Sequence, residues 1–174
     1  MKNSPLIDLL KSDLERYYFY NGLSAKRVSF FHLYKCFIIP RCMLATSYRI
    51  SHSMYKIGLT PIAQLISWLA FFIFGSEINC KTVIGPYLYF PHSNGIVIGA
   101  DRVGAYALIY HQVTIGASRI DFEGDNRPVI GNNVTIGSGA KVLGKLEVPD
   151  NSLITANQVV TKSNVNSLKI CRRS

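Results

Sequence analysis

The second half of the chain repeats an apolar residue at a fixed interval of six. The positions are Ile78, Ile84, Phe90 and Ile96, then Val103, Ile109 and Ile115, and finally Ile130, Ile136, Val142, Val148, Ile154 and Val160. The interval predicts a parallel β-helix, because each hexad can form one short strand that points its apolar residue inward, and three hexads complete one triangular coil. A sandwich or a barrel would instead show alternation with loops of variable length.

Two interruptions break the interval. One residue is inserted between 96 and 103, and the stretch GASRIDFEGDNRPV makes an excursion between 115 and 130. Long loops in solenoids are usually functional. This one leaves the coil one hexad past His111, so we expect it to fold over or beside the corner that carries the histidines His92 and His111.

Residues 5–74 carry a different period. Apolar residues recur at spacings of three and four, as in Leu6, Leu9, Leu10 and Leu14, which is typical of amphipathic helices. The expected fold class is therefore α+β. A helical domain over 1–74 precedes a β-helix with one protruding loop over 75–163, and a tail follows over 164–174.

The uncharged stretch Pro61–Gly75, PIAQLISWLAFFIFG, permits two interpretations. It is shorter than the ~20 residues that span a bilayer. We expect it first to form a helix buried in the core. The alternative is a helix that touches the inner leaflet of a membrane, with Arg41, Arg49 and Lys56 nearby.

Composition limits the class of protein. The 174 residues, 48% of them hydrophobic, suffice for one domain with a helical extension, and the formal charge of +9 is spread over both halves. Such a charge suits an anionic ligand or a membrane surface, whereas no zinc-finger spacing, arginine-rich arm or aromatic RNA-binding motif indicates nucleic acid. The four cysteines form no CxxC pair, so we expect reduced structural thiols and no metal. The acid-containing N-terminus is not a signal peptide, so we expect a cytoplasmic protein.

The repeat places two histidines at the same position of consecutive coils. His92 and His111 each lie two residues after a hexad position, and Ser138 occupies that place in the next coil. Two titratable rings beside a loop and glycine-bearing turns predict a pocket at this corner. The remaining histidines, His32 and His52, lie among aromatic and apolar residues and are expected to be structural.

The segments EINCKTVIGPYLYFPHSNGIVIG and DNRPVIGNNVTIGSGAKVLG resemble the serine acetyltransferase branch of the left-handed β-helix acyltransferases. The helical part, including SYRISHSMYKIG, is similar to the helical domain that precedes the β-helix in that family. The resemblance implies an acetyl-CoA-dependent O-acetyltransferase that assembles as a homotrimer or a dimer of trimers.

By this resemblance His92 is the general base and Glu77 is the acid that orients its ring. A hydroxyl attacks a thioester poorly until its proton is removed, and an imidazole with a pKa of about 6.5 suits that task near neutral pH. The carboxylate would fix the tautomer and stabilise the imidazolium. Backbone N–H groups would stabilise the oxyanion, and the same histidine could protonate the thiolate of coenzyme A.

Coenzyme A would lie in the groove between the β-helices of adjacent subunits. The resemblance assigns to it Gly116, Ala117, Gly137, Gly139, Ala140 and Lys141, and either Lys141 or the pair Arg172 and Arg173 could meet its phosphates. The glycines also suit tight turns of the coil. Lys141 is alternatively a solvated charge.

Departures from the family's pattern concern the acceptor. Pro91 stands where serine enzymes typically have Asp, and Asn126, Arg127 and Pro128 stand where they have Arg-His-Pro, residues that handle the carboxylate of the amino acid. His111 replaces a residue that is commonly Gln, and a histidine there resembles the colanic-acid and capsule type of acetyltransferase.

We therefore expect the acceptor to be a sugar hydroxyl of a bacterial surface polysaccharide or its precursor, contacted by His111, Asn126 and Arg127. The apolar, basic N-terminal region would fit work at the cytoplasmic face of the inner membrane. Serine O-acetyltransferase of cysteine biosynthesis is the alternative. A β-helix that binds a partner or a glycan without turnover is the third hypothesis.

Overall fold

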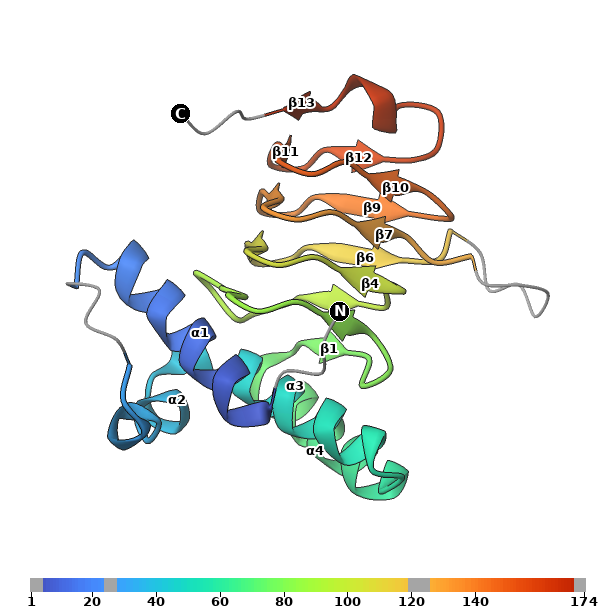
Figure 1. Cartoon of the computed structure of the whole chain (residues 1–174). Coiled ribbons are helices and arrows are strands. Elements are labelled where there is room, and N and C mark those ends of the chain that lie inside the picture. The colour runs from blue at the N-terminus through green and yellow to red at the C-terminus, as the bar shows by residue number, and fades with distance from the viewer. Residues whose placement is uncertain (1–4, 24–27, 119–125, 171–174) are drawn as a thin grey trace.

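A computed structural model describes residues 5–23, 28–118 and 126–170. The described chain begins with helices α1 (Leu6–Tyr20), η1 (Phe30–His32, 3-10), α2 (Lys35–Ile38), α3 (Pro40–Lys56) and α4 (Thr60–Phe74). These helices pack at one end of a stack of coils, and the C-terminal segment lies at the other end (Figure 1).

Short strands build the coils. They are β1 (Glu77–Ile78), β2 (Val83–Ile84), β3 (Val97–Ile98), β4 (Arg102–Val103), β5 (Leu108–Ile109), β6 (Thr114–Gly116), β7 (Val129–Ile130), β8 (Thr135–Ile136), β9 (Lys141–Leu143), β10 (Glu147–Val148), β11 (Ser152–Ile154), β12 (Val159–Val160) and β13 (Lys169–Ile170), with the 3-10 helix η2 (Val165–Ser167) before β13.

The strands form three sheets, with the orders β1-β3-β6-β9-β12, β2-β4-β7-β10 and β5-β8-β11-β13. All pairs are parallel except β11 with β13, which is antiparallel. Successive strands of a coil belong to different sheets, so the chain turns a corner after each one. The predicted parallel β-helix is confirmed.

The apolar repeat forms the core of the β-helix. Every hexad residue named above is at most 5% exposed, and most are completely buried. Full burial of one such side chain contributes roughly 1.5–3 kcal/mol. Because each coil buries its apolar residues only against its neighbours, this contribution repeats along the stack.

The strand register shows that the extra residues lie earlier in the chain than the sequence predicted. Strand β3 aligns Ile98, not Ile96, with the inward residues of β1 and β6. The turn after Phe90 is therefore two residues longer than a hexad, and the next turn is one residue shorter. The expectation of a single inserted residue between 96 and 103 was wrong, because Ile96 and Ile98 are both buried and either satisfies the pattern. The longer turn is the one that carries His92.

A buried ion pair fastens the helical domain to the first coil. The Arg49 guanidinium donates to the Asp13 carboxylate at 2.9 and 3.1 Å, and to the carbonyl oxygens of Ile84 and Gly85 at 2.6 Å each. Asp13 also accepts a bond from the N–H of Leu88 at 2.8 Å. Sequence analysis grouped Arg49 with charges near a membrane-facing helix, and this was wrong, because its side chain is 1% exposed inside the protein.

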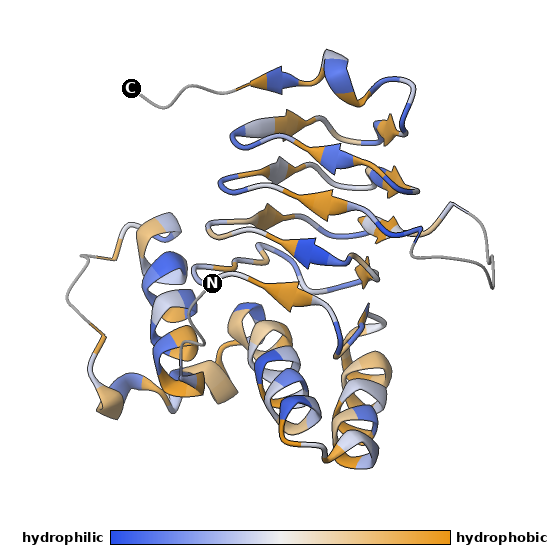
Figure 2. Ribbon diagram, turned by 45° about the vertical axis from the view of Figure 1, so that its right-hand side comes forward, coloured by the Kyte–Doolittle hydropathy of each residue, from blue (hydrophilic) through white to orange (hydrophobic). Residues whose placement is uncertain are grey.

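Helix α4 lies on the surface of the described chain. It packs against α3 and β1 through small residues, since Ala63 and Ala70 are its buried positions. Apolar residues occur all along it (Figure 2), and large ones such as Trp68 and Phe72 are 58% and 65% exposed. The expectation of a helix buried in the core was therefore wrong for this chain. Among the described residues, no helix has the length and hydropathy needed to cross a bilayer.

Candidate functional site

The two stacked histidines mark one corner of the β-helix. Tyr89 forms a parallel β-bridge with Leu108, and β5 pairs with β8. The hexad residues that precede His92, His111 and Ser138 therefore lie in register. The rings of His92 and His111 meet edge to face, with centroids 5.2 Å apart. The predicted stacking of this pair on consecutive coils is confirmed. His92 is exposed and His111 is half-buried.

Glu77 enters this corner from the preceding coil. The hydroxyl of Ser76 donates to the carbonyl oxygen of Ser93 at 2.7 Å and accepts from the N–H of Ile96 at 3.0 Å, which holds the start of β1 beside the turn that carries His92. Among the described residues no hydrogen bond joins the Glu77 carboxylate to the His92 ring. The role of Glu77 as an orienting acid stays a prediction.

His111 has an unused ring atom. Its Nδ1 is buried and has no hydrogen-bond partner among the described residues. A buried polar atom without a partner is costly, so such an atom in a native structure calls for an additional bonding group. Because the His92 ring stands directly beside it, a substrate or a second subunit at this corner would reach both rings.

The glycine-rich turn between β8 and β9 belongs to the same corner. Gly139 has a positive φ of 71°, and a Cβ there would collide with the side-chain oxygen of Asn157 in the next coil. A Cβ on Gly137 would lie 2.6 Å from the amide nitrogen of Ala156. Both glycines are thus required by the stacking of coils, whatever else they contact.

Two further residues of the predicted cofactor set lie at this turn. Ala140 is completely buried in the core, so its side chain faces inward. The ammonium group of Lys141 donates to the carbonyl oxygen of Gln112 at 2.9 Å, next to His111. Lys141 is thus held across two coils at the histidine corner, and it is not a freely solvated charge.

The excursion begins and ends at a different corner. Gly116 closes β6, its carbonyl oxygen accepts from the N–H of Gly144, and Ala117 beyond it is exposed. Asn126 accepts a bond from the N–H of Lys145 at 3.1 Å. The chain passes here from the first sheet to the second, whereas the histidines lie where it passes from the third to the first. Residues 119–125 of the predicted loop lie outside the described residues.

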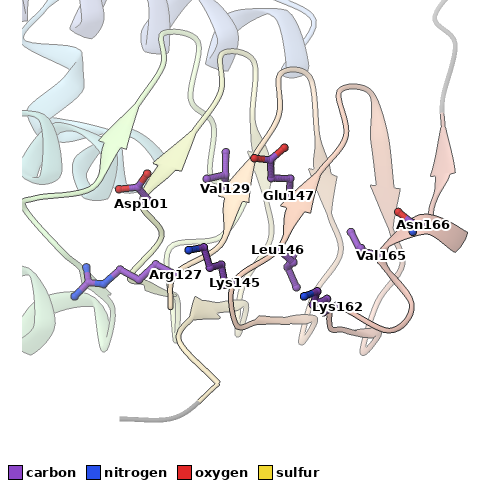
Figure 3. A pocket seen from close by; sticks show the side chains of 9 residues that line it. All are labelled: Asp101, Arg127, Val129, Lys145, Leu146, Glu147, Lys162, Val165 and Asn166. Carbon is purple, nitrogen blue, oxygen red and sulfur yellow. The ribbon is translucent and has the colours of Figure 1, made fainter. Parts of the chain in front are cut away.

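Arg127 lines a cavity of about 490 Å³ on this second corner (Figure 3). Lys145 and Lys162 lie on the same wall, and Asp101 and Glu147 add carboxylates. Both lysines were missed from the sequence, because each lies between or beyond the apolar hexad positions and has the pattern of an ordinary outward charge. Within one chain, then, the predicted substrate residues fall into two groups, with His111 at one corner and Asn126 and Arg127 at another. Arg172 and Arg173 lie outside the described residues.

A further cavity, of about 570 Å³, separates helix α4 from β1. Glu77 lines it from the β-helix side, and Gln64, Trp68 and Phe71 line it from α4. The helical period alone cannot say which element α4 packs against, so sequence analysis did not connect these residues with Glu77. The predicted acid therefore faces an aromatic wall.

The remaining polar and sulfur groups have structural surroundings. Nδ1 of His52 lies 2.8 Å from the carbonyl oxygen of Cys80, and burial lowers the pKa of this ring. Burial raises the pKa of the Cys36 thiol to about 11 and that of Cys42 to about 12, so both are protonated at neutral pH. In the described ranges, no cluster of three or more His, Cys, Asp or Glu residues could hold a metal ion.

The three-sheet coil with its histidine corner defines a left-handed parallel β-helix of the hexapeptide-repeat class. No family model matches the chain. A serine acetyltransferase from Helicobacter pylori is 43% identical over 114 residues, which are 65% of this chain and 66% of that protein. In sequence and in fold, the chain is similar to serine acetyltransferases.

Solved structures agree with this assignment. A Brucella abortus serine acetyltransferase in complex with coenzyme A superposes with a TM-score of 0.76 at 27% identity, over 88% of this chain and 60% of that one. The Neisseria gonorrhoeae serine acetyltransferase gives 0.77 at 26% identity, over 92% and 60%. These shares of the chain include much of its helical domain. The chain spans less than two thirds of the length of each of these three proteins.

Proposed function

We propose that the protein is an acetyl-CoA-dependent O-acetyltransferase in which His92 is the general base. The observation that carries this proposal is the stacked pair of His92 and His111 beside the glycine-rich turn that holds Lys141. A similar protein of the same fold has been solved in complex with coenzyme A, which supports acetyl-CoA as the co-substrate.

The chemistry requires one proton to move twice. His92 takes the proton of the acceptor hydroxyl as its oxygen attacks the thioester carbonyl, and the resulting tetrahedral intermediate carries a negative charge on oxygen. When the C–S bond breaks, the imidazolium returns the proton to the departing thiolate. Acetyl ester and free coenzyme A are the products. Glu77 would stabilise the imidazolium if its carboxylate reaches the ring in the assembled enzyme.

L-Serine is the first acceptor to test. The curated relatives bear the name serine acetyltransferase, and they favour this alternative over the sugar hydroxyl that the sequence departures suggested. Lys145 and Lys162, close to Arg127, offer cationic groups for a carboxylate even though the family's Arg-His-Pro is absent.

A sugar hydroxyl is the second candidate, and a specific observation supports it. Arg127 shares its cavity with the carboxylates of Asp101 and Glu147, which compete with a substrate carboxylate for its guanidinium. A sugar needs only hydrogen bonds, and the aromatic wall of Trp68 and Phe71 beside Glu77 suits the apolar face of a pyranose.

The test measures release of coenzyme A from acetyl-CoA by the full chain, with L-serine in one series and acceptor oligosaccharides in the other. The variants are His92→Ala and, as a matched histidine control, His32→Ala in η1. Activity that His92→Ala abolishes and His32→Ala retains supports the proposal, and the series in which it occurs identifies the acceptor class. Equal release by wild type and His92→Ala in both series would leave a binding protein without turnover.

A further inference from the structure

The helical domain exposes large apolar side chains on two of its elements. On α4, Leu65, Trp68 and Phe72 are between 52% and 65% exposed, and on the segment of η1 and α2, Phe31 and Ile38 are 84% and 67% exposed. Single exposed apolar residues are common, but a patch that joins several of them marks an interaction surface.

A shallow apolar groove connects these two elements. It has a volume of about 250 Å³, and Phe37 of α2, Met43 and Ile50 of α3, and Leu69 and Ile73 of α4 line it. Thr46 and Ser47 supply the polar side chains of the lining, apart from the thiol of Cys36. The exposed faces of α2 and α4 therefore belong to one surface, which we call the basal surface.

Basic side chains predominate around the basal surface, and one carboxylate, that of Glu77, lines the cavity beside Trp68 and Phe71. Residues 16–76 contain seven Lys or Arg residues and no Asp or Glu. Arg49 is buried in its ion pair, whereas Arg41 and Lys56 are exposed and Lys35 is partly exposed. Two copies of this surface would bring like charges together, but a layer of anionic headgroups over hydrocarbon would complement both its charge and its apolar residues.

We propose that the basal surface docks on an anionic lipid bilayer, with α4 lying in the plane of the interface. At 15 residues α4 is too short to cross the membrane, and an uncharged helix rich in Trp, Phe and Leu beside basic residues is typical of an interfacial position. Leu65, Trp68 and Phe72 would enter the boundary between headgroups and acyl chains. This inference is independent of the proton transfers of the proposed reaction, and Trp68 is the one residue that it shares with the proposed sugar contact.

The chain contains its own reporter of docking. Trp68 is the only tryptophan in the sequence, and it lies on α4 between Leu65 and Phe72. The full chain is mixed with vesicles of equal parts phosphatidylglycerol and phosphatidylcholine, and with vesicles of phosphatidylcholine alone. We expect a blue shift of its fluorescence with the anionic vesicles, quenching when the lipids carry brominated acyl chains, and weaker binding at high salt.

Substitutions that keep the reporter test the surface itself. Leu65→Glu with Phe72→Glu should weaken co-sedimentation with the anionic vesicles at least about tenfold, because two charges would enter the interface. The packing side of α4, with Ala63 and Ala70, stays intact. Ile170→Glu is the matched control, since Ile170 is 49% exposed on β13, at the opposite end of the molecule, and should leave binding unchanged (Figure 1).

Two results would overturn the proposal. One is an absence of quenching by brominated lipid in the wild type, or co-sedimentation that the double substitution does not change. The other is a larger assembly in lipid-free solution that the double substitution dissociates, because a second copy of the chain would then cover the basal surface.

Discussion

At the scale of single residues, Arg49 and Asp13 hold opposite charges in a place that water does not reach. The pair links α1 to α3, and the remaining donors of Arg49 serve the carbonyl oxygens of the first coil. An arrangement of this kind is expensive to break from one side only, because the other charge then stays buried without a partner.

We therefore expect Arg49→Met to lower the free energy of unfolding by about 3–5 kcal/mol. The free energy of unfolding is measured by chemical denaturation of Arg49→Met, of Asp13→Leu and of the double variant. The loss in the double variant should be smaller than the sum of the two single losses, since it leaves no isolated charge. Additive losses would mean that the two side chains act independently.

His52 gives the stability a pH dependence of known sign. Burial lowers the pKa of its ring in the folded protein, so the folded state binds fewer protons than the unfolded state near the ordinary pKa of about 6.5. The contribution of this pKa difference to the free energy of unfolding is present above a pH of about 6.5 and is lost as the pH falls through that value. His52→Gln should remove it, so the stability difference between wild type and variant should shrink as the pH falls from about 7.5 to 5.5. A difference that does not change with pH would contradict this.

The residue scale also shows what the sequence could not reveal. Nothing in the spacing of Asp13 and Arg49 indicates that they meet, because helix packing brings together residues 36 positions apart. His92 and His111 could be paired in advance only because the coil repeats a fixed geometry. Asn126 and Arg127 follow a long loop, whose path no period describes, and within one chain they lie at a different corner from the histidines.

At the scale of elements, the glycine in the turn between β8 and β9 differs from the glycine that ends β6. Gly139→Ala should destabilise the fold by about 1–3 kcal/mol, because its backbone has a positive φ and its Cβ would meet Asn157. Gly116→Ala is the matched control, since its φ is ordinary and nothing lies within 4 Å of an added Cβ. Thermal unfolding measures both.

Gly116→Ala also tests the predicted cofactor groove. If acetyl-CoA passes over the end of β6, the added methyl group should raise KM for acetyl-CoA and leave the melting temperature unchanged. An unchanged KM would remove Gly116 from the cofactor site.

A Gly139→Ala variant as stable as the wild type would contradict the expected collision between its Cβ and Asn157.

The secondary-structure elements differ in how well their positions and packing could be predicted from the sequence. The strands were predictable, because each inward position demands an apolar residue and the demand recurs every six positions. The register of β3 was not, since Ile96 and Ile98 satisfy that demand equally. Helix α4 was misjudged because an uncharged, mostly apolar helix suits a core, a bilayer or another protein alike, and its surroundings decide among them.

At the scale of the whole molecule, the described residues of one chain do not bring the histidine corner and the corner of Arg127 together. His92 lines none of the cavities described above, and the corner of Arg127 lies elsewhere on the coil. Neighbouring β-helices could bring the two corners of different chains together. This agrees with the trimer that the family resemblance implies.

We therefore expect light scattering at micromolar concentration to give three times the chain mass of 19.4 kDa, or six times if trimers pair. The measurement should be made without lipid and repeated with the Leu65→Glu and Phe72→Glu double variant, so that association through the basal surface is distinguished from association through the β-helices. A monomeric wild type would argue against a cofactor groove between subunits.

The antiparallel strand β13 limits how far such a stack can grow. A solenoid of parallel coils exposes a fresh template at its open end, on which another chain could continue in the same direction. Here β13 lies against β11 in the reverse direction, and Lys169 puts a charge on the outermost edge. The helical domain covers the first coil at the other end (Figure 1). Fibre formation by end-to-end addition of β-helices is thus discouraged at both ends.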